Sequence, residues 1–310
     1  MENKKENKEI DSKEKALDYA ILDYLRDTTN PNLEGGYEIG GRHYDNYMSN
    51  DEWKKFLREM SPLHIDMYNK GRGGELEEKR GRYGLYPPKM ASFGSSSRFI
   101  YELSKEILGF VFEEKLSTFV GGKANLDGFL PKEDENIYVE TKCREIYGSH
   151  KKVEISDVYK EVYKSLKKTT KENFDYKTDT SKKEGYSKYT FKYNGKDIEH
   201  FDIKQLICHF LGIAADYLTN KLTKKIKFIY LIFDPREVED KIDKKYNEKL
   251  IKIYNETIEE IKSIDMCRLF EAVWEYQKGN KDMKYNVIKQ QRPKFDFVVC
   301  SQYNYKEYIK

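Results

Sequence analysis

The segment Leu126–Glu145 constrains the fold more than any other stretch of the chain, because its residues predict two short strands joined by a polar turn. Side chains in a strand alternate between its two faces. In the second strand this alternation places Glu140 and Lys142 on one face, and Ile137 and Val139 on the other. The acid and the lysine are therefore expected to point in the same direction.

The register of this hairpin decides whether Asp127 joins them. If Leu130 pairs with Ile137, Asp127 lies opposite Glu140, with the two Cβ atoms about 4.5–5.5 Å apart. A shift of one residue would turn Asp127 to the opposite face. The predicted register therefore brings two carboxylates and one ammonium group together.

Two carboxylates at such a separation repel each other unless a cation shares them. Proteins hold Mg²⁺ with one or two carboxylates and leave positions for water and phosphate oxygens. A lysine beside such an ion would place positive charge where negative charge develops in phosphoryl transfer. The three residues therefore predict a magnesium site that acts on phosphate esters, with Mn²⁺ as a substitute ion.

Asp127 followed by Glu140-Thr141-Lys142 resembles the motif of the PD-(D/E)xK nuclease superfamily, the fold of restriction endonucleases and Holliday-junction resolvases. The resemblance covers residues 95–235 once a long insertion is skipped, and it is most similar to a bacterial group classed as restriction endonucleases. Leu126 stands where the motif has proline. The resemblance implies that Asp127 and Glu140 hold the metal with the backbone carbonyl of Thr141. It also implies that Lys142 positions the attacking hydroxide and stabilises the phosphorane.

The helix predicted at Phe201–Leu218 carries three polar side chains along the edge of its apolar stripe, Asp202, Gln205 and His209. In related nucleases a polar residue on this helix helps to hold the substrate or the attacking water. Gln205 is the residue predicted for this role. His209 is the second choice, because a lone histidine at such a position is more often part of the core edge.

A third acid is predicted on the strand Phe110–Leu116, where Glu114 shares a face with the phenylalanine side chains and would face the metal. The resemblance more often takes this acid from the preceding helix, which offers Glu102 and Glu106. Glu113 is a further alternative. Glu114 is the predicted metal ligand, and the other three acids remain open.

The fold class expected from these patterns is α/β, with a restriction-endonuclease-like core of helix, three strands, helix and strand. A near-continuous apolar run at Ile226–Phe233 predicts a central strand buried on both faces, and a last strand is predicted at Phe295–Cys300. The first core helix follows Ser95–Ser97. The central mixed sheet is expected to be flanked by additional helices over residues 16–25, 51–60, 240–261 and 265–277.

The domain organisation predicted from the sequence is an extension of helices and loops at 1–94 and a nuclease-like domain at 95–310, with a basic insertion at 151–198. Between Lys151 and Lys196 there are 13 lysines and 7 acids, a net charge of +6, whereas the whole chain has a net charge of +3. Six tyrosines interleave with these lysines. They predict contacts with phosphates and bases, and a solvated, partly mobile insertion is the alternative.

The composition argues against several other classes of protein. The four cysteines have no CxxC spacing, so they indicate free thiols rather than a zinc site or a disulfide framework. No apolar run approaches the roughly 20 residues of a membrane span, and the first residues lack the apolar core of a signal peptide. A cytoplasmic protein with no membrane partner is expected.

The function expected from the sequence is a Mg²⁺-dependent endonuclease that hydrolyses phosphodiester bonds of double-stranded DNA in restriction or defence. A homodimer is expected by analogy, because such enzymes often need two sites to cut both strands. The alternatives are a nucleic-acid-binding module without catalysis, and a nuclease that acts on RNA or in DNA repair. An ordinary exposed hairpin with cross-strand charge pairs would remove the site altogether.

Overall fold

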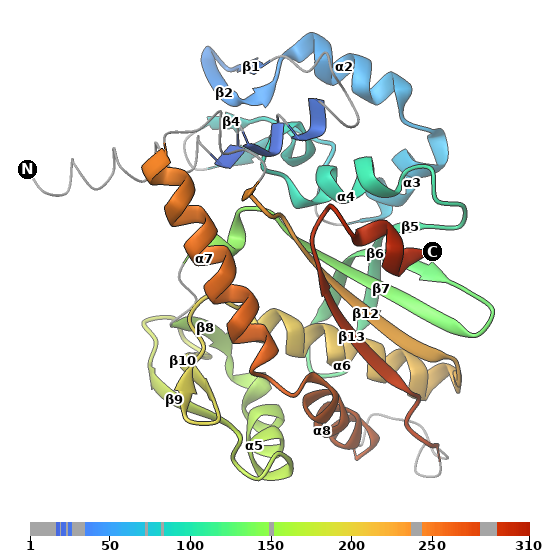
Figure 1. The fold of residues 1–310 in the computed structure, drawn as a ribbon, viewed down its shortest axis with the longest axis vertical. Helices are drawn as coiled ribbons and strands as arrows, with labels where there is room; N and C mark the ends of the chain where they lie inside the picture. The colour runs from blue at the N-terminus through green and yellow to red at the C-terminus, as the bar shows by residue number, and fades with distance from the viewer. Residues whose placement is uncertain are drawn as a thin grey trace, which may run out of the picture.

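A mixed sheet of five strands lies at the centre of the chain, in the order β13-β12-β7-β6-β5 (Figure 1). The computed structural model describes residues 17–18, 20–22, 24–26, 35–71, 74–81, 84–148, 152–236, 244–279 and 290–310. The strands of the sheet are β5 (Val111–Ser117), β6 (Lys123–Pro131), β7 (Glu135–Lys142), β12 (Lys225–Ile232) and β13 (Phe295–Cys300). The expected mixed α/β fold with a central sheet and flanking helices is confirmed.

Short connections make the first three strands antiparallel, and the longer connections make the last two parallel. Leu130 pairs with Ile137, so the register predicted for the hairpin is confirmed. The β7 strand pairs along its whole length with β12, from Glu135 opposite Lys225 to Lys142 opposite Ile232. The hairpin therefore lies inside the sheet and not at an exposed edge.

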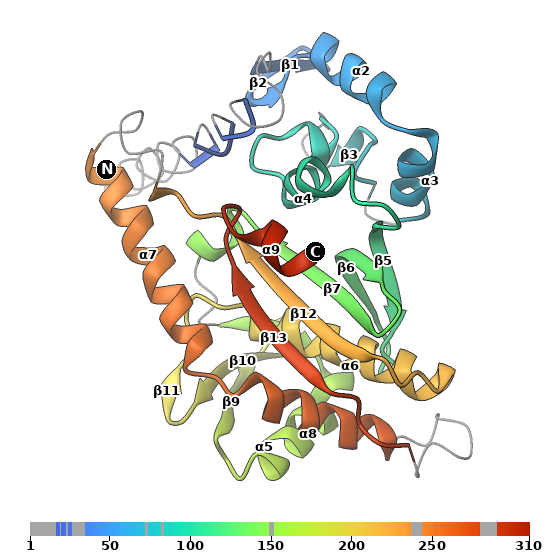
Figure 2. The same cartoon turned by 45° about the vertical axis from the view of Figure 1, so that its right-hand side comes forward.

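Helices cover both faces of this sheet (Figures 1 and 2). One face carries α6 (Ile203–Asn220) and α8 (Met266–Lys278), which pack against each other, and α6 also lies on β5 and β6. The other face carries α4 (Ser96–Ser104). Both core helices begin with a capping side chain, since Ser95 Oγ accepts from Arg98 N and Asp202 Oδ1 accepts from Gln205 N.

At Glu113 the backbone of β5 reverses which face of the sheet its side chains point to. The φ of +58° at this residue lies in the left-handed region, which side chains other than glycine rarely adopt. As a result Phe112 packs into the core on the α4 face, whereas Leu116 packs into the core on the α6 face. The prediction that Glu114 shares a face with Phe112 was wrong, because an ideal alternation cannot anticipate this backbone reversal.

The basic insertion is folded on the α6 side of the sheet. Its elements are β8 (Val153–Ser156), α5 (Lys160–Thr169), β9 (Phe174–Thr180), β10 (Tyr186–Tyr193) and β11 (Lys196–Asp197). Tyr163, Tyr189 and Tyr193 are buried in the core, so these three rings do not offer a face for base stacking. Several of its lysines pair with acids of the insertion, for example Lys167 with Asp175.

The first 94 residues contribute to the α4 face. Their elements are β1 (Gly35–Ile39), β2 (Arg42–Met48), α2 (Asn50–Glu59), α3 (Pro62–Lys70), β3 (Lys79–Gly81) and β4 (Gly84–Tyr86). The helix predicted at 51–60 corresponds to α2. Trp53 and Tyr68 share a core cluster with Phe112 of the sheet. Residues 1–15 lie outside the described residues, and so does part of the helix predicted at 16–25.

The remaining helices are α7 (Lys244–Lys262) and α9 (Tyr305–Ile309). The helices predicted over 240–261 and 265–277 correspond to α7, as far as it is described, and to α8. Among the described residues, no helix combines the length and the apolar character that crossing a membrane requires.

Candidate active site

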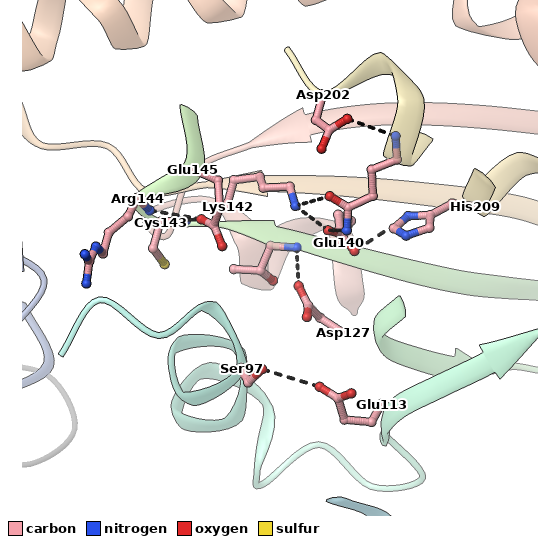
Figure 3. Close-up of polar contacts among 12 residues, drawn as sticks. Ser97, Glu113, Asp127, Glu140, Lys142, Cys143, Arg144, Glu145, Asp202 and His209 are labelled. Carbon is pink, nitrogen blue, oxygen red and sulfur yellow. Dashed lines mark hydrogen bonds and ion pairs between the residues drawn. The ribbon is translucent and has the colours of Figure 1, made fainter. Parts of the chain in front are cut away.

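The candidate site lies where the ladder between β6 and β7 ends (Figure 3). The last pair is Gly128 opposite Val139. Beyond this pair, the side chain of Asp127 accepts the hydrogen bond that a backbone carbonyl of a paired strand would otherwise accept. Its Oδ2 lies 2.7 Å from the backbone N of Thr141, which donates to it. Asp127 is thereby held against β7 at the peptide that joins Glu140 to Thr141.

Glu140, Lys142 and Gln205 form a closed triangle of hydrogen bonds. Lys142 Nζ donates to Glu140 Oε1 at 2.6 Å and to Gln205 Oε1 at 2.6 Å. Gln205 Nε2 donates to the same Glu140 oxygen at 2.7 Å. The first turn of α6 thus clamps the acid and the lysine of β7, which share a face as predicted.

The triangle is buried. The exposed fractions are 2% for Glu140 and 5% for Lys142, and every residue of β7 is buried. An exposed hairpin with cross-strand charge pairs is therefore not what the chain forms. Removing such a pair of charges from water is costly, so the pair is not expected to add much to the stability of the fold. Buried ionisable groups of this kind are instead common at functional sites.

Burial and charge shift the ionisation of the site. Burial raises the pKa of Glu140 to about 7, although the ammonium of Lys142 lowers it. Burial alone would lower the pKa of Lys142, but Glu140, Tyr230, Glu145 and Asp127 together outweigh it and raise that pKa well above 10.5. Burial and the charge of Glu140 raise the pKa of Asp127 well above 3.8. The lysine therefore stays cationic, and the two acids resist carrying charge together.

His209 lies one turn further along α6 and faces the free oxygen of Glu140. Its Nδ1 is 3.6 Å from Glu140 Oε2. Both atoms are buried, and neither has a hydrogen-bond partner among the described residues. The ring also donates to the backbone carbonyl of Asn125. Burial and the nearby Lys142 lower the pKa of His209 to about 3, so the imidazole is neutral.

A third acid, Glu113, lies beside Asp127. The flanking pairs of β5 and β6 place Glu113 opposite Asp127. Burial, the charge of Asp127 and that of Glu75 raise the pKa of Glu113 to about 8. Ser97 Oγ lies 3.4 Å from a carboxylate oxygen of Glu113 and 3.4 Å from one of Glu75 (Figure 3 shows Ser97 and Glu113).

The other candidate acids lie elsewhere. Glu114 is on the α6 face, where burial and the charge of Asp216 raise its pKa. Glu102 pairs with Lys105 at 2.7 Å, and both line a separate pocket with Glu106. The structure thus gathers Asp127, Glu140, Thr141, Lys142 and Gln205 at one place, but it does not bring Glu114 to them.

A cavity of about 670 Å³ opens beside the site. The first residues of α4, Ser95–Ser97, line one part of it, and Arg144 and Glu145 line another. Glu145 is held in place because its carboxylate accepts from the backbone N–H groups of Cys143 and Arg144. The cavity therefore borders both the end of β7 and the serine that contacts Glu113.

One acid of this region, Glu75, escaped sequence reasoning, and Glu113 was not singled out by it. Glu75 lies in a loop with no periodicity, although its burial at 5% exposure is unusual for an acid. Glu113 was only one of four alternatives, because the backbone reversal that turns it toward Asp127 has no sequence signal. The described residues contain no group of three or more His, Cys, Asp or Glu side chains arranged as a ready metal site.

One observation tests whether the residues fit a divalent cation. Glu140 Oε2 is a buried carboxylate oxygen that receives no donor from the described residues. Such an oxygen is costly unless a ligand satisfies it. The oxygen ligands of Asp127, Glu140 and the Thr141 carbonyl are of the kind that Mg²⁺ prefers.

Comparisons with known protein families, with curated proteins and with solved structures found no match for this chain.

Proposed function

We propose that the chain is a divalent-metal-dependent nuclease that hydrolyses phosphodiester bonds in DNA. The observation that carries the proposal is the buried triangle of Glu140, Lys142 and Gln205 next to Asp127. A charged triangle at a point where a strand ladder ends has no evident structural benefit, since apolar side chains of similar volume often stabilise a buried position at least as well.

The topology supports the same proposal. The order α4, β5, β6, β7, α6 and β12 is the order of helix, three strands, helix and strand that the resemblance implies. A restriction-endonuclease-like core is therefore the finer fold that we propose within the mixed α/β architecture. Because fold similarity alone does not establish chemistry, the proposal depends on the site.

Each side chain has a role in the proposed reaction. Asp127, Glu140 and the backbone carbonyl of Thr141 would hold the cation. When bound, a divalent cation polarises a phosphoryl oxygen and lowers the pKa of a bound water molecule. Lys142 stays cationic and provides fixed positive charge where the pentavalent phosphorus develops negative charge. Gln205 keeps both Glu140 and Lys142 in position.

The third carboxylate that we favour is Glu113 rather than Glu114. Glu113 lies opposite Asp127, whose charge contributes to the raised pKa of Glu113, whereas the charge that raises the pKa of Glu114 is that of Asp216. A raised pKa at a cluster of acids is typical of a site that is completed by a cation.

The test is cleavage of DNA by purified protein with Mg²⁺, Mn²⁺ or EDTA. We expect Asp127→Asn and Lys142→Gln to abolish metal-dependent cleavage while circular dichroism shows a folded chain. Lys204→Ala is the matched control, because Lys204 also follows an acid by two residues but is exposed on α6. Cleavage that survives in either site variant would reject the proposal.

A second function is favoured by one specific observation. The Asp127 oxygen that bonds to Thr141 N–H is already occupied, and no ready cluster of three metal-binding side chains is found in the part of the chain that the structure describes. A DNA-binding protein without catalysis would retain such an arrangement. Binding that weakens steeply with salt, without cleavage under any metal, would identify that function.

A further inference from the structure

The pair formed by His209 and Glu140 is unusual in its chemistry. Nδ1 of His209 and Oε2 of Glu140 face each other at 3.6 Å, and the exposed fraction of each residue is 2%. No described residue donates a hydrogen bond to either atom. Lys142 and Gln205 both donate to the other oxygen, Oε1, so they leave Oε2 unsatisfied.

The imidazole is fixed in the orientation of a ligand. The ring donates to the backbone carbonyl of Asn125. Since Nδ1 has no partner, Nε2 makes this hydrogen bond, and Nδ1 carries the lone pair. Histidines that bind metals usually donate their second N–H to a backbone carbonyl or a carboxylate, which sets both the tautomer and the ring orientation.

Two acceptors that face each other require something between them. The distance of 3.6 Å between Nδ1 and Oε2 is also too long for a hydrogen bond between them. An ion that binds nitrogen and oxygen at about 2.1 Å reaches both atoms, because twice that distance exceeds their separation. A cation also offsets the cost of leaving two buried lone-pair atoms unpaired.

We propose that His209 binds the divalent cation through Nδ1, beside Oε2 of Glu140. The inference rests on the proposed nuclease function and adds a nitrogen ligand to an otherwise all-oxygen set. An imidazole ligand favours ions such as Mn²⁺ over Mg²⁺, which prefers oxygen. Relative to Mg²⁺, the site therefore favours Mn²⁺, and His209 is the residue that sets this preference.

The experiment uses the full chain labelled with ¹⁵N-histidine and loaded with Mn²⁺, and measures the hyperfine coupling between manganese and ¹⁵N by pulsed electron paramagnetic resonance. We expect a directly bound imidazole in the native protein and its loss in His209→Asn. His64→Phe is the matched control, since His64 is a half-buried histidine outside the site whose pKa is also lowered by burial. Its coupling should equal that of the native protein.

Titration calorimetry provides a second readout that does not depend on activity. We expect His209→Asn to weaken Mn²⁺ binding by about 10–100-fold and Mg²⁺ binding by less, so that the preference for Mn²⁺ falls. Asparagine is small and polar, and a folded His209→Phe variant would serve if asparagine were not tolerated.

The outcomes separate this inference from the proposed function. Manganese that binds and supports cleavage without any imidazole coupling would overturn the role of His209 and leave the nuclease proposal intact. Coupling that persists in His209→Asn would assign the ligand to another histidine and also overturn it. A native chain that neither binds Mn²⁺ nor cleaves DNA would reject both.

Discussion

Replacing Glu113 with glutamine should make the metal-free protein more stable at alkaline pH. Burial, followed by the charges of Asp127 and Glu75, raises the pKa of Glu113 from an ordinary value of 4.5 to about 8. Below about pH 4.5 its carboxyl group is protonated in both the folded and the unfolded chain. As the pH rises through the range up to about 8, the unfolded chain loses this proton while the folded chain keeps it, so stability falls.

The size of the effect follows from the two pKa values. The full difference corresponds to about 5 kcal/mol above pH 8, and partial exposure of Glu113 reduces the expected gain to about 2–4 kcal/mol. For a chain of this length such a gain raises the melting temperature by roughly 3–6 °C. Near pH 4.5 the variant and the native protein should agree within about 0.5 kcal/mol.

The assay is thermal or urea unfolding in EDTA at several pH values. Glu77→Gln is the matched control, because it removes the same charge at an exposed position. If Glu113 also belongs to the cation site, Glu113→Gln should gain stability and lose cleavage together. A gain that is equal at pH 4.5 and above pH 8, or no gain at all, would refute the raised pKa of Glu113.

Three further substitutions test the packing around the site. Gly212→Ala should cost about 1–3 kcal/mol in thermal unfolding, although alanine normally stabilises a helix, because the added Cβ would lie 2.6 Å from the Cβ of Ala124. Arg98→Met should stabilise the protein by about 1–3 kcal/mol in urea unfolding, since this guanidinium is fully buried and its side-chain nitrogens have no hydrogen-bond partner among the described residues; a loss would mean that the charge is satisfied. Glu260→Gln should cost about 1–3 kcal/mol and speed amide hydrogen exchange at residues 199–201, whose N–H groups donate hydrogen bonds to its carboxylate. Unchanged exchange there would show that these bonds do not hold the segment that leads into α6.

Much of the core could be predicted from local patterns. Alternation over two residues placed Glu140 and Lys142 on one face, and matching apolar positions set the register of Leu130 against Ile137. The apolar stripe of α6 placed Gln205 near the sheet. These predictions succeeded because a helix or a strand repeats its geometry at every residue, so neighbouring side chains report the same face.

The sequence by itself therefore determined which elements form and which side chains share a face. Only the tertiary structure decided which side chains meet. Lys142 and Gln205 are 63 residues apart, Glu75 arrives from a loop without periodicity, and Glu113 turns toward Asp127 through a left-handed backbone. Contacts of this kind depend on how elements cross and on single backbone angles, and neither quantity is repeated along the chain. For this reason periodicity could find the two carboxylates and the lysine, but not the third acid.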